Sequence, residues 1–192
     1  SAVYDSKPDA VTFLKEWTAL AASGSGERGI YNVSNLKKYA KRRDFENHTL
    51  RSNPCGEILL RPFQFCNLSE VVVRAEDTFD DLIQKVEAAV WMGAIQSTLT
   101  KFNFIRDEFR KNCEEERLLG VSLTGQMDNP ALMTEEKLQI LKSYAIKIAK
   151  TACKALEINL SVSITTGKPS GTVSQLVDAA SGCHPRHARR SR

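Results

Sequence analysis

The residues with the clearest chemical potential in this sequence lie in the segment Asn53-Pro54-Cys55-Gly56-Glu57. Cys55 provides a thiol, and Glu57 provides a carboxylate that can act as a general base. Pro54 fixes one backbone torsion and Gly56 permits close approach of a ligand, so the segment predicts a rigid loop tip. The same spacing also fits a buried thiol beside a surface acid, and the segment alone leaves both interpretations open.

A second thiol of interest is Cys66, which follows eleven residues after Cys55. The chain has five cysteines, an odd number without a Cys-x-x-Cys pair, and its three histidines form no zinc pattern with them. We interpret Cys153 as a packing residue because it falls in an apolar helical pattern. The sequence therefore predicts buried cysteines and reactive ones, with Cys113 among the structural ones.

A third segment, Ser170-Gly171-Thr172, opens a predicted short helix. The first turn of a helix has free backbone N–H groups and the positive end of the helix dipole, which together favour an anion. The hydroxyl groups of Ser170, Thr172 and Ser174 add donors. The segment fits a phosphate-binding turn, and an ordinary capping turn is the alternative.

These segments need a scaffold, and hydrophobic periodicity predicts one of helices and strands. Helical spacing predicts helices at residues 9–22, 78–95, 102–117 and 135–156, with a short exposed helix within residues 34–47. Strands are predicted at residues 118–125 and 160–165, and a buried irregular loop at residues 53–68. Strands that alternate with long helices indicate an α/β layered or barrel architecture.

Composition narrows the class of protein. The chain has 192 residues of which 42% are hydrophobic, enough for one ordinary core. Its net charge is +4, and the basic residues cluster at residues 37–43 and 186–192, a pattern more typical of solvated faces than of a nucleic-acid site, although the terminal run could contact an anionic ligand. No apolar run approaches the roughly 18 residues of a membrane span, and no signal peptide is recognisable, so we expect a cytoplasmic protein without membrane contact.

Three blocks of the sequence, at residues 53–74, 112–125 and 168–186, together resemble the catalytic subunit of ribonucleotide reductases. The similarity is strongest to the monomeric class II, adenosylcobalamin-dependent ribonucleoside-triphosphate reductases. The resemblance implies an α/β fold in which residues 1–192 form a single segment of the family's ten-stranded α/β barrel. It places the active-site finger loop at about residues 51–68 and a phosphate-binding turn at about residues 168–176. The N- and C-terminal parts of the full enzyme are expected to be absent.

The resemblance also implies a role for each catalytic residue. Cys55 would become the thiyl radical that takes the 3′ hydrogen of the ribose, with adenosylcobalamin as the cofactor that starts the radical chemistry. Glu57 would accept the proton of the 3′ hydroxyl, and Asn53 would hold the ribose hydroxyls. Cys66 would be one of two thiols that deliver electrons by closing a disulfide, with its partner outside this chain.

The resemblance further implies contacts with substrate and with other proteins. Ser52, Ser170, Gly171, Thr172 and Ser174 are the candidate substrate-binding residues, and no metal-ligating residue is predicted. The expected partners are the ribonucleotide substrate, other reductase polypeptides that supply the missing barrel parts, and thioredoxin or a similar dithiol. No direct nucleic-acid binding is expected.

Other functions stay open at this point. Glu57 argues against the glycyl-radical class III enzymes, which lack this glutamate. A class I type catalytic fragment that uses a separate radical subunit is an alternative, as is a non-catalytic nucleotide-binding or scaffolding segment. Without the resemblance, the cysteines would fit a thiol redox protein.

Overall fold

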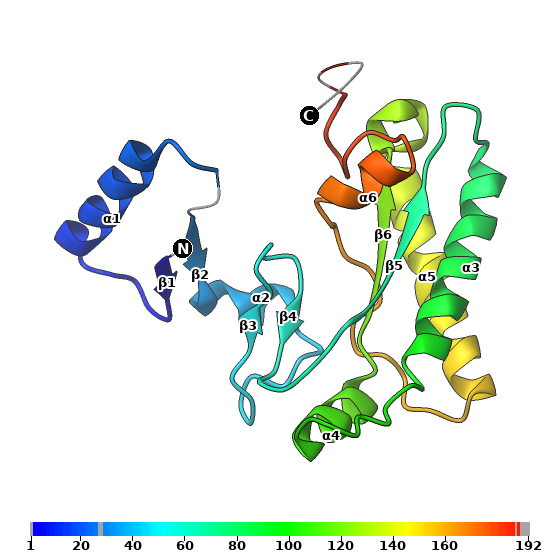
Figure 1. Ribbon diagram of the computed structural model, residues 1–192, viewed down its shortest axis with the longest axis horizontal. Coiled ribbons are helices and arrows are strands. Elements are labelled where there is room, and N and C mark those ends of the chain that lie inside the picture. The colour runs from blue at the N-terminus through cyan, green and yellow to red at the C-terminus, as the bar shows by residue number, and fades with distance from the viewer. Residues whose placement is uncertain (1, 27–28, 187, 189–192) are drawn as a thin grey trace. The chain divides into compact units, whose positions relative to one another are not determined.

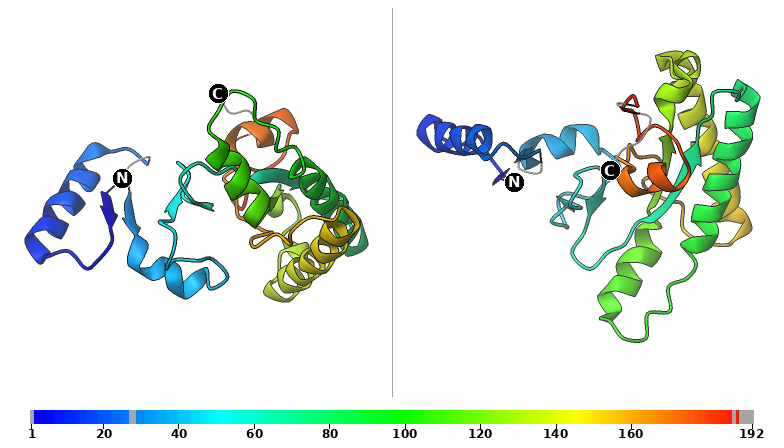
Figure 2. Two further views of the ribbon diagram at one scale, coloured as in Figure 1. Left: turned by 90° about the horizontal axis from the view of Figure 1, so that it is seen from below. Right: turned by 45° about the horizontal axis from the view of Figure 1, so that its top comes forward.

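The structure of the chain is a computed structural model that describes residues 2–26, 29–186 and 188. The chain divides into two compact units, Ser1–Thr49 and Leu50–Arg192, which are drawn in Figure 1 and from two further sides in Figure 2. The basic run at residues 186–192 lies largely outside the described residues, so its predicted contact with an anion stays a prediction.

The smaller unit pairs two short parallel strands. Its elements are β1 (Ala2–Tyr4), α1 (Ala10–Ser23), β2 (Ile30–Asn32), the 3-10 turn η1 (Val33–Asn35) and α2 (Leu36–Tyr39). The predicted first helix is confirmed as α1, and the Asp9 side chain caps it by accepting a hydrogen bond from Thr12 N. The short helix predicted within residues 34–47 is found as α2. Residues 41–47 fold into turns instead, because the Asp44 carboxylate accepts from the backbone N–H groups of Glu46 and Asn47.

The larger unit contains the residues of chemical interest. Its elements are β3 (Arg51–Ser52), β4 (Leu59–Leu60), β5 (Asn67–Val72), α3 (Phe79–Gln96), α4 (Asp107–Glu116), β6 (Leu119–Thr124), the 3-10 turns η2 (Gln126–Asp128) and η3 (Pro130–Leu132), α5 (Glu135–Ala155) and α6 (Gly171–Leu176). The predicted helices at 78–95 and 135–156 are confirmed as α3 and α5, and the helix predicted at 102–117 is confirmed as α4 only from Asp107, since residues 102–106 are not helical. Thr78 and Asp81 form a capping box that starts α3.

The centre of this unit is the parallel pair β5 and β6, in register from Asn67 opposite Leu119 to Val72 opposite Thr124. A connection through α3 and α4 joins the two strands, which is the usual solution for parallel neighbours. Helices α3 and α5 lie side by side on one face of the strands, and α6 lies across the other face (Figures 1 and 2). The face toward α3 and α5 therefore packs against the core, and the face toward α6 carries the polar residues described below.

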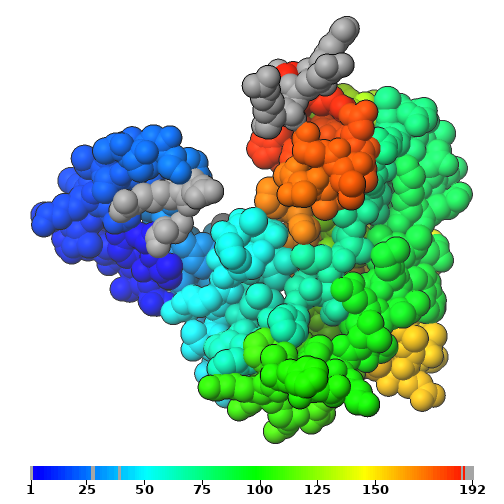
Figure 3. All heavy atoms as spheres, viewed as in Figure 1, coloured from blue at the N-terminus to red at the C-terminus, as the bar shows by residue number. Residues whose placement is uncertain are grey.

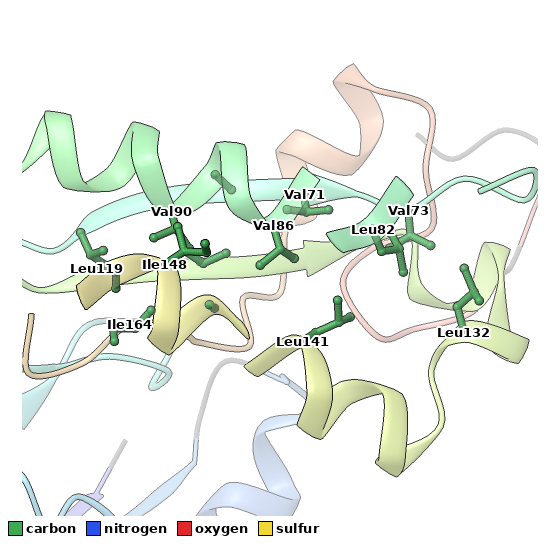
Figure 4. Close-up of a cluster of buried hydrophobic side chains, with 14 residues drawn as sticks. Val71, Val73, Leu82, Val86, Val90, Leu119, Leu132, Leu141, Ile148 and Ile164 are labelled. Carbon is green, nitrogen blue, oxygen red and sulfur yellow. The ribbon is translucent and has the colours of Figure 1, made fainter. Parts of the chain in front are cut away.

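The core fills the space between the strands and the two long helices. In Figure 4, Val86 and Val90 of α3 and Leu141 and Ile148 of α5 point toward the strands. Val90 is fully buried, and burying a side chain of this size contributes roughly 1.5–3 kcal/mol. This packing gives β5 and β6 a rigid support.

Two predictions about strands need correction. The predicted irregular loop at residues 53–68 contains β4 and the start of β5 and directly follows β3; none of these three strands was predicted. Residues 160–165 form no regular strand, although Leu119 N and Val121 N donate to Ser163 O and Ile164 O and an isolated bridge joins Val121 to Thr165. The alternation of apolar and polar residues was misleading at its start, since Ser161 is buried while the apolar Leu160 is half exposed. The strand at residues 118–125 is confirmed as β6.

In the described part of the chain, no helix is long and apolar enough to cross a bilayer.

Candidate active site

The segment predicted to carry the chemistry is the turn of the antiparallel hairpin β3–β4, in which Ser52 pairs with Leu59. Asn53 braces this turn with three hydrogen bonds. Its backbone N donates to Ile58 O (3.0 Å), its backbone O accepts from Gly56 N (3.0 Å), and its side-chain Oδ1 accepts from Ile58 N (3.1 Å). Because Ile58 N already donates to the side-chain Oδ1 of Asn53, the Nδ2 amide is the part of this side chain that is available to a ligand.

Cys55 lies at the exposed tip of this turn. Gly56 beside it has a φ of 83°, a left-handed conformation that glycine adopts without steric cost. The prediction of a buried loop is wrong at this point, because Pro54, Cys55 and Gly56 are all exposed. The hairpin reverses direction here, so its tip projects away from the core. The thiol is therefore accessible to another molecule.

Glu57 lies at the end of the turn, two residues before β4, and is half-buried. Its backbone O accepts a hydrogen bond from Thr166 Oγ1 at 2.9 Å. Its carboxylate Oε2 is buried and has no hydrogen-bond partner among the described residues. A buried acceptor without a donor is costly, so this oxygen is suited to a donor that arrives with a ligand, such as a hydroxyl group.

Cys66 immediately precedes β5, and its sulfur lies over Gly120 of β6. A Cβ atom at Gly120 would be 3.2 Å from Cys66 Sγ, 3.3 Å from Thr166 Cγ2 and 2.5 Å from Leu68 Cδ2. The absence of a side chain at Gly120 thus leaves room above β6 for both the sulfur and Thr166. Thr166 also holds the Glu57 backbone, so Gly120 has neighbours from the segments of both Cys66 and Glu57.

Sequence reasoning did not identify Thr166 or Gly120 as parts of the site. Gly120 does fall inside one of the three blocks that carry the family resemblance, which was the available signal. Thr166 lies 109 residues from Glu57 in the sequence, and no local pattern marks it.

The predicted phosphate-binding turn begins α6, which lies at the surface of its unit (orange in Figure 3). Ser170 is buried, and its Oγ donates a hydrogen bond to Glu70 Oε1. Ser174 is also buried, and its Oγ donates to Gly171 O at 3.1 Å. Gly171 and Thr172 are exposed. The structure thus divides the predicted set into two residues that the protein itself engages and two that face solvent.

The polar face of the strands carries two charged groups near this turn. Burial raises the pKa of the Glu70 carboxyl, and the nearby Lys168 ammonium partly offsets the effect. The Lys168 backbone N donates to Ser122 Oγ at 3.0 Å. Segment 168–170 is therefore attached to both β5 and β6.

The remaining cysteines divide as predicted. Cys113 is buried in α4, its sulfur accepts a hydrogen bond from Phe65 N at 3.4 Å, and burial raises the pKa of its thiol. Cys153 is buried in α5 beside Ser161, which confirms its packing role. Cys183 is exposed in the turn that follows Gly182.

A buried ion pair holds the loop between the hairpin and β5. Arg61 is 5% exposed, and its guanidinium contacts Glu115 at 2.8 Å and Glu116 at 3.2 Å. Gln64 also donates to Glu116. Removing one partner of such a buried network leaves an uncompensated charge, so these contacts fix the loop that leads to Cys66.

Comparison with known proteins places these features in context. No family model matches the chain. Over 83% of its length, the chain is 28% identical to the adenosylcobalamin-dependent ribonucleoside-triphosphate reductase of Lactobacillus leichmannii and 27% identical to the protein of the same name from Euglena gracilis. It spans only 26% and 23% of those two proteins, about a quarter of their length.

The fold gives a concordant result. A solved structure of a B12-dependent, class II ribonucleotide reductase superposes on 96% of this chain and 30% of its own, with a TM-score of 0.64 and 21% identity. The mixed α/β arrangement of this chain is thus that of a part of a class II reductase. The resemblance predicted from the sequence is confirmed, while the ten-stranded barrel, the finger loop and the single-segment organisation stay predictions.

Proposed function

We propose that this chain is a central catalytic part of an adenosylcobalamin-dependent ribonucleoside-triphosphate reductase, acting as one part of a split or fragmented enzyme. The observation that carries the proposal is the β3–β4 turn, which presents the exposed Cys55 thiol two residues from Glu57, whose buried Oε2 lacks a donor. The names of the sequence relatives support the reaction. Because the chain spans about a quarter of those relatives, its activity depends on further parts.

In the proposed reaction, Cys55 and Glu57 activate the ribose together. A thiyl radical at Cys55 takes the hydrogen atom from the 3′ carbon, and Glu57 accepts the proton of the 3′ hydroxyl. The Asn53 amide donates to a ribose hydroxyl, and Ser52 lies at the base of the same turn. The buried Oε2 of Glu57 fits this task, because a substrate hydroxyl would supply its missing donor.

The 2′ hydroxyl then leaves as water, and the reduction consumes two electrons. Cys66 and a second thiol supply them by losing two hydrogen atoms and forming a disulfide. The 3′ hydrogen returns from Cys55, so the radical is regenerated. The second thiol comes from another reductase polypeptide, and thioredoxin or a similar dithiol reduces the disulfide after each turnover.

Adenosylcobalamin is the radical source that the names of the relatives suggest. When bound, it supplies the first radical by homolysis of its carbon–cobalt bond. The exposure of Cys55 fits such a cofactor, since the radical must reach the sulfur directly. The turn at residues 168–176 is proposed to bind the substrate phosphates through the exposed Gly171 and Thr172, while Ser170 and Ser174 shape it from within.

Reconstitution tests this function. The chain would be combined with reductase polypeptides that supply the remaining parts, together with adenosylcobalamin and a dithiol, and deoxynucleotide formation would be measured. Cys55→Ser should lower turnover by about 10³-fold or more, because an oxygen-centred group cannot replace the thiyl radical. Cys183→Ser is the matched control, an exposed cysteine outside the proposed site, and should retain activity.

Full activity of the Cys55→Ser assembly would contradict the radical mechanism. Nucleotide binding without any deoxynucleotide product would instead support the non-catalytic binding segment. Product formation that requires a separate metal-containing subunit rather than adenosylcobalamin would support the class I type.

A further inference from the structure

The polar face of the strand pair holds the phosphate-binding turn at two neighbouring points. Glu70 of β5 lies opposite Ser122 of β6 in the register. Ser122 Oγ accepts a hydrogen bond from Lys168 N, and Glu70 Oε1 accepts one from Ser170 Oγ. Segment 168–170 is thus attached to both strands immediately before α6 begins.

Ser170 has an unusual backbone conformation for a residue with a side chain. Its φ is 54° and its ψ is 33°, in the left-handed region. Such a residue is stable only where its surroundings fix it, and residues of this kind are concentrated at functional sites. Ser170 is 5% exposed, so the donor side of its bond to the partly exposed Glu70 is buried.

The loop at residues 181–182 also packs closely against this segment. A Cβ atom at Gly182 would lie 2.7 Å from Lys168 O, so the backbone of residue 182 passes directly against the segment. Ser181 Oγ adds a hydrogen bond to Pro169 O at 2.7 Å. The turn is therefore held between the strands and the loop at residues 181–182, and the side chain that fixes its Ser170 corner is Glu70.

We propose that Glu70 is a positioning residue for the phosphate-binding turn. Glu70 accepts a hydrogen bond from the Ser170 hydroxyl and thereby holds Ser170 in the left-handed conformation from which α6 starts. This keeps Gly171 and Thr172 at the surface. The part of this inference that concerns substrate phosphates rests on the proposed function; the part that concerns the turn does not.

The chemistry required of Glu70 is limited and can be tested. The site needs an oxygen that accepts a hydrogen bond, which a glutamine also provides, whereas alanine provides none. A negative charge is not needed, and beside a phosphate site it is unfavourable. Lys168 reduces this disadvantage by its electrostatic interaction with Glu70. Glutamine should therefore replace Glu70 successfully.

Hydrogen exchange in the full 192-residue chain tests this role. Glu70→Ala should accelerate exchange of the amides in residues 170–176 by about tenfold or more, whereas Glu70→Gln should stay within about threefold of the unaltered chain. Glu76→Ala removes an exposed carboxylate shortly after the same strand and is the matched control, with no expected change. The affinity for inorganic triphosphate, measured by calorimetry, should fall for Glu70→Ala and be retained for Glu70→Gln.

A second pair of variants addresses the left-handed residue itself. Ser170→Ala removes the hydroxyl and keeps the steric penalty, so it should accelerate exchange as Glu70→Ala does. Ser170→Gly removes both and should recover part of the protection. These variants also carry the test if Glu70→Ala fails to fold.

The outcomes separate the two proposals. Unchanged exchange in Glu70→Ala and Ser170→Ala would overturn the positioning role, and so would a Glu70→Gln variant as fast as Glu70→Ala. If the exchange pattern appears as expected but the unaltered chain binds no triphosphate, the positioning role stands. In that case the assignment of the turn to substrate phosphates fails.

Discussion

At the scale of single residues, Glu57 has the most specific environment in the site. Its Oε2 is buried without a donor, while its backbone is held by Thr166. Glu57→Gln keeps the size of the side chain but cannot accept a proton. We expect turnover of the reconstituted reductase to fall by about 10²–10⁴-fold, the usual contribution of a general base, with nucleotide affinity nearly unchanged.

Steady-state and single-turnover kinetics on the same assembly would measure this loss. Glu76→Gln is the matched control, since this exposed glutamate has the same side chain outside the site. A Glu57→Gln enzyme as fast as the control would exclude the general-base role.

The sequence predicted the burial of single cysteines better than the hydrogen-bond partners of the site residues. The packing role of Cys153 followed from its apolar helical pattern and is confirmed, and the burial of Cys113 agrees with the structural role assigned to it. The engagement of Ser170 by Glu70 could not be predicted, because a sequence shows that a hydroxyl is present but not which acceptor it meets 100 residues away. The same holds for Thr166.

At the scale of elements, the close contact between β6 and the start of β5 depends on Gly120. An alanine there would place its Cβ 2.5 Å from Leu68 Cδ2 and 3.2 Å from Cys66 Sγ. Since both neighbours belong to a packed sheet face, we expect Gly120→Ala to lower the free energy of unfolding by about 1–3 kcal/mol.

Urea denaturation followed by circular dichroism would measure this change. Gly167→Ala is the control, because a Cβ at Gly167 meets no atom within 4 Å, and it should change stability by less than about 0.5 kcal/mol. Equal stability of the two variants would show that the Gly120 contact is not restrictive.

An ion pair between Arg186 and Asp128 links the C-terminal segment to η2, and its stabilising effect depends on pH. The Arg186 guanidinium contacts Asp128 at 2.8 Å and holds the pKa of that carboxyl below its usual value. A lowered folded-state pKa stabilises the protein at pH values above the ordinary carboxyl pKa. This stabilisation is lost as the pH falls through the lowered value.

Asp128→Asn should therefore be less stable than the unaltered chain by about 1 kcal/mol near neutral pH, a modest amount because Arg186 is partly exposed. The difference should shrink toward zero as the pH falls through the lowered pKa of Asp128. Denaturation curves across this pH range would show it. Asp178→Asn, which alters a highly exposed partner of the same arginine, should have a smaller effect. A difference that grows in acid would contradict the argument.

Helices were predicted more reliably than strands, for a physical reason. The hydrophobic spacing and the caps of α3 and α5 are local, so Thr78 and the apolar positions after it were sufficient. Strand β5 is defined by its pairing with β6, about 50 residues away, and its polar residues hide the pattern. Residues 160–165 show the opposite error, in which alternation occurs without regular pairing.

At the scale of the whole chain, the strand pair has an open side. Among the described residues, β5 pairs only with β6, so its outer edge has no strand partner, although Lys85 Nζ donates a hydrogen bond to Val72 O at 3.1 Å. A groove of about 270 Å³ lies between β5 and α3, and its lining combines apolar residues such as Ala88 and Met92 with the charged Glu70, Arg74 and Lys85. Met92 is 63% exposed. Exposed strand edges next to exposed apolar side chains favour pairing with another chain.

We therefore expect the isolated chain to associate with itself or with other reductase polypeptides. In sedimentation velocity, the mean sedimentation coefficient should rise with concentration. Met92→Lys places a charge beside the β5 edge and should weaken association by about tenfold or more, equivalent to about 1.4 kcal/mol. Ile140→Lys is the control, because Ile140 is an apolar residue of α5 that is also exposed (45%), and it should leave association unchanged. A chain that stays monomeric at high concentration would show that this edge is protected by other means, and equal weakening by both lysines would indicate general repulsion rather than pairing at β5.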